Sequence, residues 1–168
     1  MAVLINSLLV AEMYSVFLVW FLFINVYKVV MVRMFMEGMR YEKIHTQRVF
    51  YLLKVRKWVQ ACLTMCVMRA YKLLWWFTIV GGLIKHYSYF MVPYIVAENP
   101  EIGANETITL SRKMMNGHKW ELFILDLSFL GWEILGAFTG WIVNILITRP
   151  YKETTMCEYY AMLRRIGK

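Results

Sequence analysis

Two carboxylates inside an apolar segment are the residues best placed to do chemistry. Asp126 and Glu133 are seven residues apart, about two helical turns, so a helix places both on one face. A carboxylate inside a membrane costs roughly 3 kcal/mol and normally faces a partner or water. The two acids could bind a cation or relay protons, with Lys72, Arg69 or Lys28 as counter-charges. A structural ion pair within a helix bundle, or an interfacial position for Asp126, explains them without such a function.

A second polar group marks the start of a helix. Asn99 suits the N-cap, Pro100 suits the first helical position, and Glu101 adds an acid to the first turn. These signals predict an amphipathic helix over 99–117, which is too short and polar to span a bilayer and should lie at the cytoplasmic interface. Four residues here carry oxygen ligands: Glu98, Asn99, Glu101 and Glu106. They could bind a divalent ion, although capping and the helix dipole explain them more simply.

No arrangement of residues predicts catalysis or a cofactor. His118 lies beside Lys119 and Trp120, without a Ser or Cys nucleophile in a recognisable motif, so we expect an interfacial role for it. The sequence contains no P-loop, no dinucleotide-binding glycine pattern and no HExxH zinc motif. We therefore expect a protein that is not an enzyme and binds no cofactor.

The cysteines do not predict a disulfide or a structural metal site. Cys62, Cys66 and Cys157 are odd in number and lack CxxC spacing, so we expect three reduced thiols. Cys62 and Cys66 are four residues apart on one helical face. Metal binding there is conceivable, but buried apolar thiols are far more common.

The composition favours a membrane over water as the surroundings of this chain. Of its 168 residues, 60% are hydrophobic, 17% aromatic and 18% charged, whereas soluble domains have about 25% charged residues. One core of this size cannot bury so much apolar surface, so lipid must cover the rest. The net charge of +8 lies beside apolar stretches and includes no base-reading motif, which favours anionic lipid headgroups over nucleic acid as a partner.

The first two apolar regions predict different membrane elements. Residues 2–35 predict one long transmembrane helix that ends near Gly38. The formal charges in this region are Glu12, Lys28 and Arg33. Residues 58–97 are too long for one span, and the paired glycines Gly81 and Gly82 predict a turn, so we expect a helical hairpin there.

The third apolar region permits two interpretations. Either 120–147 is one long spanning helix, or 120–165 forms a second hairpin that continues as a C-terminal helix. We prefer the hairpin, turning near Thr139 and Gly140. It places the basic C-terminus in the cytoplasm together with the basic loop 40–57, as the positive-inside rule requires.

Gly136 and Gly140 form a GxxxG pattern, which lets two helices approach closely. Single matches are common in apolar segments. Packing within the chain or turning of the hairpin therefore outweighs dimerisation as its explanation.

Three motifs in the second half carry a resemblance to a known family. They are AENP at 97–100, GHKWE at 117–121 and LDLSF at 125–129, and they follow a tyrosine-rich segment that starts at Tyr87. With these motifs the chain resembles an uncharacterised family of bacterial membrane proteins, domain of unknown function 975. An Asn-Pro-Tyr element of that family is Arg-Pro-Tyr here, at 149–151. The resemblance implies a helical membrane protein and supplies no activity.

These observations predict an all-α, polytopic membrane bundle in one domain, 1–168, with one long N-terminal helix, two hairpins and an interfacial amphipathic helix. We expect a multi-pass protein of the cell membrane with a cytoplasmic C-terminus. The leading predicted function is a non-catalytic accessory or scaffold subunit of a membrane complex, bound to a membrane-protein partner or to copies of itself. The alternatives are a small transporter or channel that uses Asp126 and Glu133, and a membrane immunity or stress-protection protein.

Overall fold

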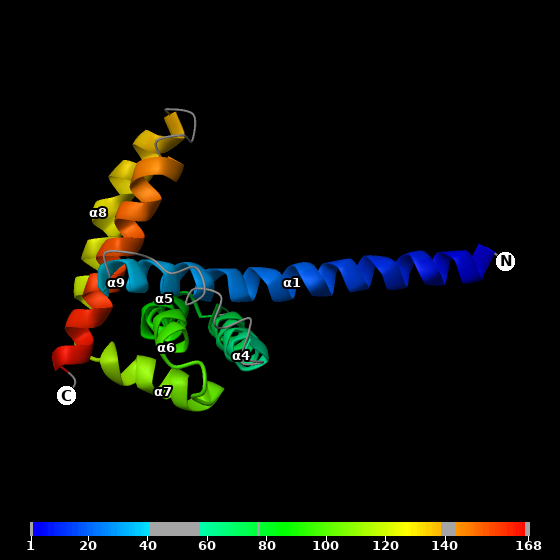
Figure 1. Ribbon diagram of the computed structural model, residues 1–168, viewed down its shortest axis with the longest axis horizontal. Coiled ribbons are helices and arrows are strands. Elements are labelled where there is room, and N and C mark those ends of the chain that lie inside the picture. Colours follow the sequence, from blue (N-terminus) through cyan, green and yellow to red (C-terminus); the bar gives the residue numbers. More distant parts are fainter. Residues whose placement is uncertain (1, 41–57, 77, 139–143, 167–168) are drawn as a thin grey trace.

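The computed structural model describes residues 2–40, 58–76, 78–138 and 144–166. Every element within these ranges is helical and none is a strand, which confirms the all-α prediction (Figure 1). One long helix extends away from a body of shorter helices. A pair of antiparallel helices leaves the body in another direction.

Helix α1, Ala2–Arg40, is continuous because its sequence is apolar and contains no proline. It continues beyond the predicted 2–35, and Gly38, which we expected to end it, lies inside its last turn. At 39 residues the helix is about 58 Å long. This length exceeds what the body can cover, so much of α1 lies outside it (Figure 1).

The two halves of α1 have different surroundings. Val29 and Val32 are fully buried in the body. Met13 is 74% exposed and Phe17 is 61% exposed, although both side chains are apolar. The helix is therefore packed into the protein by its C-terminal half, whereas the segment Val10–Phe17 is exposed throughout.

The region predicted as one hairpin over 58–97 forms three helices: α4 (Trp58–Trp76), α5 (Ile79–Ser88) and α6 (Val92–Glu98). The predicted turn at Gly81 and Gly82 is wrong, because both glycines lie inside α5. Extended backbone occurs instead at Thr78, with φ −112° and ψ 106°. A Cβ on Gly81 would lie only 2.7 Å from the Thr78 Oγ1, so this glycine permits a close approach rather than a turn.

The amphipathic helix predicted over 99–117 is shorter in the structure, where α7 runs over Ala104–Met114. Asn99 is not its N-cap. It ends α6 with φ −130° and ψ 82°, because the following Pro100 disfavours helical backbone in the residue before it. Gly103 takes the N-cap position of α7 without a side-chain hydrogen bond. The Asn-Pro pair therefore ends one helix and does not begin the next.

The C-terminal region contains α8 (Lys119–Phe138), a short π-helix η1 (Asn144–Thr148) and α9 (Arg149–Ile166). The segment made by η1 and α9 lies beside α8 and runs antiparallel to it (Figure 1). The chain therefore doubles back after Phe138. The predicted turning point at Thr139 and Gly140 lies outside the described residues.

The core surrounds α6. Every residue from Met91 to Ala97 is buried, and Tyr94, Met91 and Ile95 are the largest of these side chains. Helices α1, α4 and α7 pack against α6, and the ring of Tyr160 from α9 stacks on Tyr94 with 5.7 Å between ring centroids. A helix that is apolar on all sides is typical of such a central position. The short helix α6 thus lies at the centre of the body, in contact with α1, α4 and α7 and with Tyr160 of α9.

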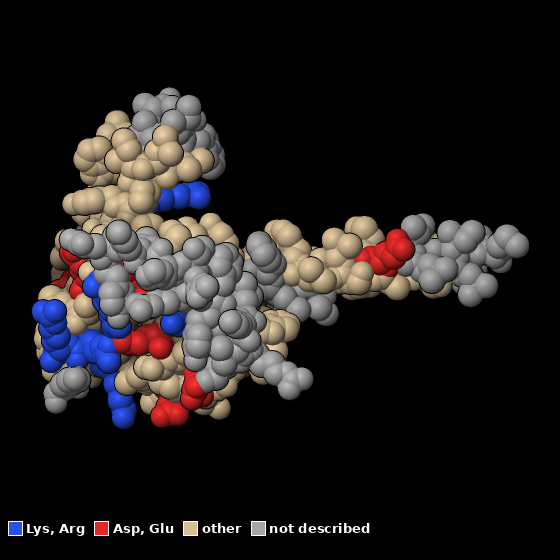
Figure 2. Space-filling model, in the orientation of Figure 1, with Lys and Arg blue, Asp and Glu red and all other residues tan. Residues whose placement is uncertain are grey.

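Much of the outer surface is apolar. In the view of Figure 2 most charged side chains gather over the body, and few are visible on the extended part of α1 and on the outer part of the α8–η1 pair. Large apolar side chains on that pair are more than half exposed: Leu127, Trp132, Leu135 and Leu146. When only the described residues are considered, none of the helices combines the length and the apolarity needed to cross a membrane.

Candidate functional site

The two predicted acids share one cation. The Lys152 Nζ lies 2.7 Å from the Asp126 Oδ1 and 2.8 Å from the Glu133 Oε1. The Lys152 ammonium lies 5.8 Å from the centroid of the Phe129 ring, a further favourable contact for a cation. The acids of α8 are thereby tied to α9.

The predicted counter-charges of these acids are elsewhere. Lys28 lies 5.9 Å from the Phe90 ring centroid, and Arg69 lies 5.7 Å from that of Phe21. Both positive charges are close enough to act on the Lys72 ammonium. The counter-charge prediction is therefore wrong, because the return of the chain brings Lys152 to the acids while Lys28, Arg69 and Lys72 gather between α1 and α4.

A second polar centre forms around Glu98 at the end of α6. The Arg40 Nη2 donates to the Glu98 Oε1 at 2.9 Å, and the Tyr160 hydroxyl donates to the Glu98 Oε2 at 2.8 Å. Arg164 also donates to the Glu98 Oε1. The Glu98 side chain is only 11% exposed, so these charge-assisted bonds replace most of its hydration. One carboxylate thus connects the ends of α1, α6 and α9.

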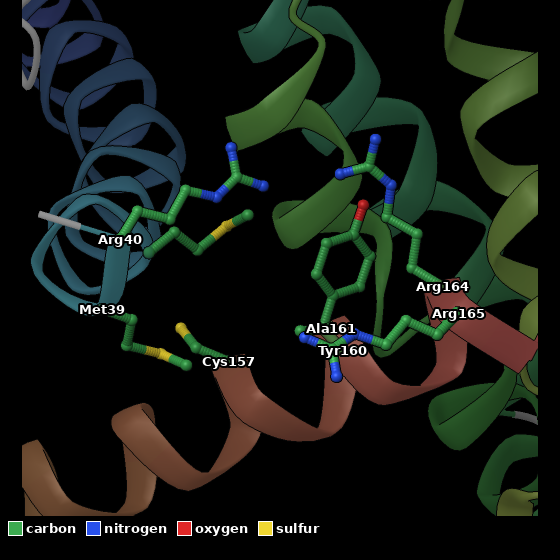
Figure 3. A pocket seen from close by; sticks show the side chains of 8 residues that line it. Met39, Arg40, Cys157, Tyr160, Ala161, Arg164 and Arg165 are labelled. Atoms are coloured by element: carbon green, nitrogen blue, oxygen red, sulfur yellow. The ribbon is translucent and has the colours of Figure 1, made fainter.

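A pocket of about 420 Å³ opens beside this centre (Figure 3). One part of its lining is apolar or weakly polar: Met36, Met39, Cys157 and Ala161. The rest is polar or charged: Arg40, Tyr160, Arg164 and Arg165. Arg40 extends from α1, and the others extend from α9 (Figure 3). A smaller hollow of about 60 Å³ lies nearby and is lined in part by Glu98.

The other titratable groups of the pocket are neutral near pH 7. Burial is the largest cause that raises the pKa of the Cys157 thiol, to about 12, and the charges of Glu153 and Glu158 add to it. Burial also raises the pKa of the Tyr160 hydroxyl, which its hydrogen bond to Glu98 raises further. Neither group is therefore an activated nucleophile. The charged groups in the lining of the pocket that can bind a ligand are therefore the guanidinium groups of its arginines.

His118 belongs to a polar contact between α8 and α9. Its Nδ1 lies 2.9 Å from the Glu121 Oε2, and the Tyr159 hydroxyl donates to the His118 carbonyl oxygen at 3.2 Å. The same hydroxyl lies 3.3 Å from the Glu121 Oε2. These bonds attach the start of α8 to the last turns of α9. They account for His118 as a structural residue.

The remaining predicted polar residues do not form one site. Glu106 is exposed in the first turn of α7, where a negative charge complements the helix dipole. The carbonyl oxygen of Glu101 accepts a hydrogen bond from the Gln60 side chain at 2.7 Å, and Pro100 is buried. The described part of the chain contains no group of three or more side chains suited to hold a metal ion.

Sequence reasoning missed the partners of Glu98. Arg40, Tyr160 and Arg164 lie 58, 62 and 66 residues away from it along the chain. No spacing rule connects side chains on three different helices. The basic residues near the ends of α1 and α9 predicted that these ends lie on the same side, but they did not predict that both ends bind one carboxylate.

Fold and site together define the class: an all-helical protein with a buried central helix and ion-pair centres that fasten its long helices to one another. The chain belongs to the family described as "Protein of unknown function (DUF975)", whose model matches residues 5–166. This match confirms the resemblance carried by the AENP, GHKWE and LDLSF motifs. No curated protein and no solved structure matches the chain.

Proposed function

We propose that the protein is a non-catalytic membrane protein that acts by association, as an accessory or scaffold subunit of a membrane complex. The observation that carries this proposal is the exposed segment Val10–Phe17 of α1. Every residue from Val10 to Phe17 is exposed, so the helix is uncovered on all sides. Its side chains are mostly apolar, with Val19 and Trp20 next along it at 64% and 58% exposure. Water is a poor solvent for such a segment.

Lipid is the environment that we propose for this segment. Residues 13–30 contain one formal charge, Lys28, so placing this stretch in lipid takes a single charged side chain out of water. A helix satisfies its own backbone hydrogen bonds, which lipid requires. The exposed apolar face of the α8–η1 pair supplies a second surface for lipid.

The contacts of Glu98 support a topology in which the C-terminal ends of two helices, α1 and α9, lie on the same side of the membrane. Arg40 is the last residue of α1, and Arg164 lies in the last turn of α9. Both bind Glu98, so the C-terminal ends of these helices lie together. In the proposed topology this basic side is cytoplasmic, in agreement with the positive-inside rule.

Association with a partner helix is proposed at the exposed N-terminal part of α1. Ser15, Val16, Val19 and Trp20 lie together on one exposed face of this segment. A small residue between larger apolar ones lets a neighbouring helix approach closely in a membrane. The shared pairing of Asp126 and Glu133 with Lys152 favours a structural role for these acids over a transport path.

The test combines membrane extraction with photo-crosslinking. We expect the protein to stay in the pellet after alkaline carbonate washing of native membranes and to be released by detergent. A photoreactive residue at Val16 should give one defined protein adduct. The matched position Thr109, exposed on α7, should give none.

Each outcome decides the proposal. Release by carbonate without detergent would rule out membrane embedding. Retention in membranes with no protein adduct at Val16, and with a single copy per particle, would rule out action by association. Flux of a solute through liposomes containing only this protein, lost in Asp126→Asn, would favour the transporter instead.

A further inference from the structure

The pocket beside Glu98 carries more positive charge than its structural role requires. Three of its lining residues are arginines, Arg40, Arg164 and Arg165, and the neighbouring carboxylate that binds two of them is Glu98. Two positive charges therefore remain uncompensated by this carboxylate. Cations held close together are stable when an anion lies between them. Glu153 and Glu158 also lie near Cys157 in the lining, but the ion pairs of Arg40 and Arg164 both go to Glu98. The arginine side of the pocket therefore has the electrostatics of an anion site.

Two of the three arginines are held in place and keep further hydrogen-bond donors. Arg40 and Arg164 each direct a terminal nitrogen to the Glu98 carboxylate. Their side chains are still 55% and 46% exposed. A guanidinium group has five N–H donors in a fixed plane, so each retains donors for a second anion. Glu98, which also accepts a hydrogen bond from Tyr160, thus holds the guanidinium groups of Arg40 and Arg164 in position.

The remaining lining indicates what kind of anion fits. Met36, Met39 and Ala161 give the pocket an apolar side next to its charged side. A phosphate matches the planar donors of arginine, and an attached glycerol or acyl segment would lie against the methionines. The volume of about 420 Å³ is in the range of pockets that hold small molecules. An inorganic ion alone would leave the apolar side uncovered.

We propose that this pocket binds the glycerol phosphate group of an anionic ligand, with Arg40, Arg164 and Arg165 as its phosphate contacts. The inference rests on the proposed membrane function, which places the ends of α1 and α9 at the headgroup level. The ligand has two possible sources, an anionic phospholipid or a free glycerol phosphate. Both present the same group to the arginines.

The experiment uses the full-length protein in a neutral detergent and native mass spectrometry. Phosphatidylglycerol and phosphatidylcholine are offered at equal concentration, and glycerol 3-phosphate is offered in a separate titration. We expect a single retained phosphatidylglycerol adduct. In Arg165→Gln the apparent affinity should fall about tenfold, since one charge-assisted contact is lost.

A matched variant separates a specific site from general charge. Arg112→Gln removes the same charge from an exposed position of α7 that does not line the pocket, and it should bind like the unchanged protein. Saturable binding of glycerol 3-phosphate that competes with the lipid would make the free ligand a source as well. Binding of the lipid alone would make the membrane the source.

Two results would overturn the proposal. One is equal retention of phosphatidylglycerol by the unchanged protein, Arg165→Gln and Arg164→Gln. The other is an equal loss in Arg112→Gln, which would mean non-specific attraction. Because carbonate extraction and crosslinking at Val16 do not depend on Arg165, failure of the phosphate site remains distinguishable from failure of the proposed function.

Discussion

The ammonium nitrogen of Lys152 lies 2.7 Å from a carboxylate oxygen of Asp126, so helix α9 supplies the counter-charge of an acid in α8. Glu133 shares the same ammonium at 2.8 Å. Lys152→Gln leaves both acids without this cation and should reduce the free energy of unfolding by about 1 to 2 kcal/mol, because partial exposure screens their charges. The melting temperature in detergent should fall by about 2 to 8 °C.

A rescue variant checks the cause of that loss. Asp126→Asn and Glu133→Gln introduced together with Lys152→Gln remove the charges on both sides, so most of the stability should return. If the triple variant melts as low as Lys152→Gln, the ion pairs are not what Lys152 contributes.

The hydroxyl of Tyr160 should contribute to the attachment of α9. Tyr160→Phe keeps the stacked ring but removes the donor to Glu98, and a lost bond to a charged group costs about 1.5 to 3 kcal/mol. Thermal unfolding in detergent measures the effect. Tyr151→Phe is the control because Tyr151 is 65% exposed, and it should leave the melting temperature unchanged. Equal effects of the two changes would contradict a special role for Glu98.

Leucines of α8 should differ in importance according to burial. Leu122 is fully buried, so Leu122→Ala should cost about 2 to 5 kcal/mol through lost contacts and a cavity. Leu127 is 52% exposed, and Leu127→Ala should cost well under about 1.5 kcal/mol. Chemical or thermal unfolding of the two variants compares them directly. A larger loss for Leu127 would mean that another molecule covers the exposed face.

Two glycines of α8 should respond oppositely to alanine. A Cβ on Gly136 would lie 2.8 Å from the Asn144 Cγ, whereas one on Gly131 would meet nothing within 4 Å. Gly136→Ala should therefore destabilise the protein by about 1 to 3 kcal/mol, and Gly131→Ala should be neutral or stabilising by up to about 1 kcal/mol. Melting temperatures decide the matter. A Gly136→Ala protein that melts normally but loses self-association would favour dimerisation through this glycine.

Cys157 should be a slow thiol despite lining a pocket. Its side chain is 2% exposed and its pKa is raised to about 12, so very little thiolate exists at pH 8. In a variant with Cys62→Ala and Cys66→Ala, alkylation of the folded protein should be at least about 100-fold slower than in denaturant. The raised pKa also means that the contribution of Cys157 to stability is fully present below about pH 9 and is lost as the pH rises toward about 12. Rapid labelling of the folded protein at pH 8 would contradict this assignment.

Several local features follow from the sequence because they depend on neighbouring residues. The uninterrupted apolar run of α1 contains no proline, and a helix is its natural state. The motif residues from Ala97 to Pro100 led to the family that the whole-chain match shows. The helix boundaries were harder. Gly38 and the pair at Gly81 and Gly82 looked like ends and turns, but each of them lies inside a helix.

The sequence alone determined the helical class, the family and the apolar segments, since backbone propensity and hydrophobicity act over a few residues. Only the tertiary structure decided which charges meet. Asp126 binds Lys152 from another helix, and Glu98 binds Arg40 and Tyr160 from two others. Such pairs depend on how helices pack and in which direction each side chain leaves its helix. Coulomb attraction over a few ångströms then selects partners that chain spacing does not reveal.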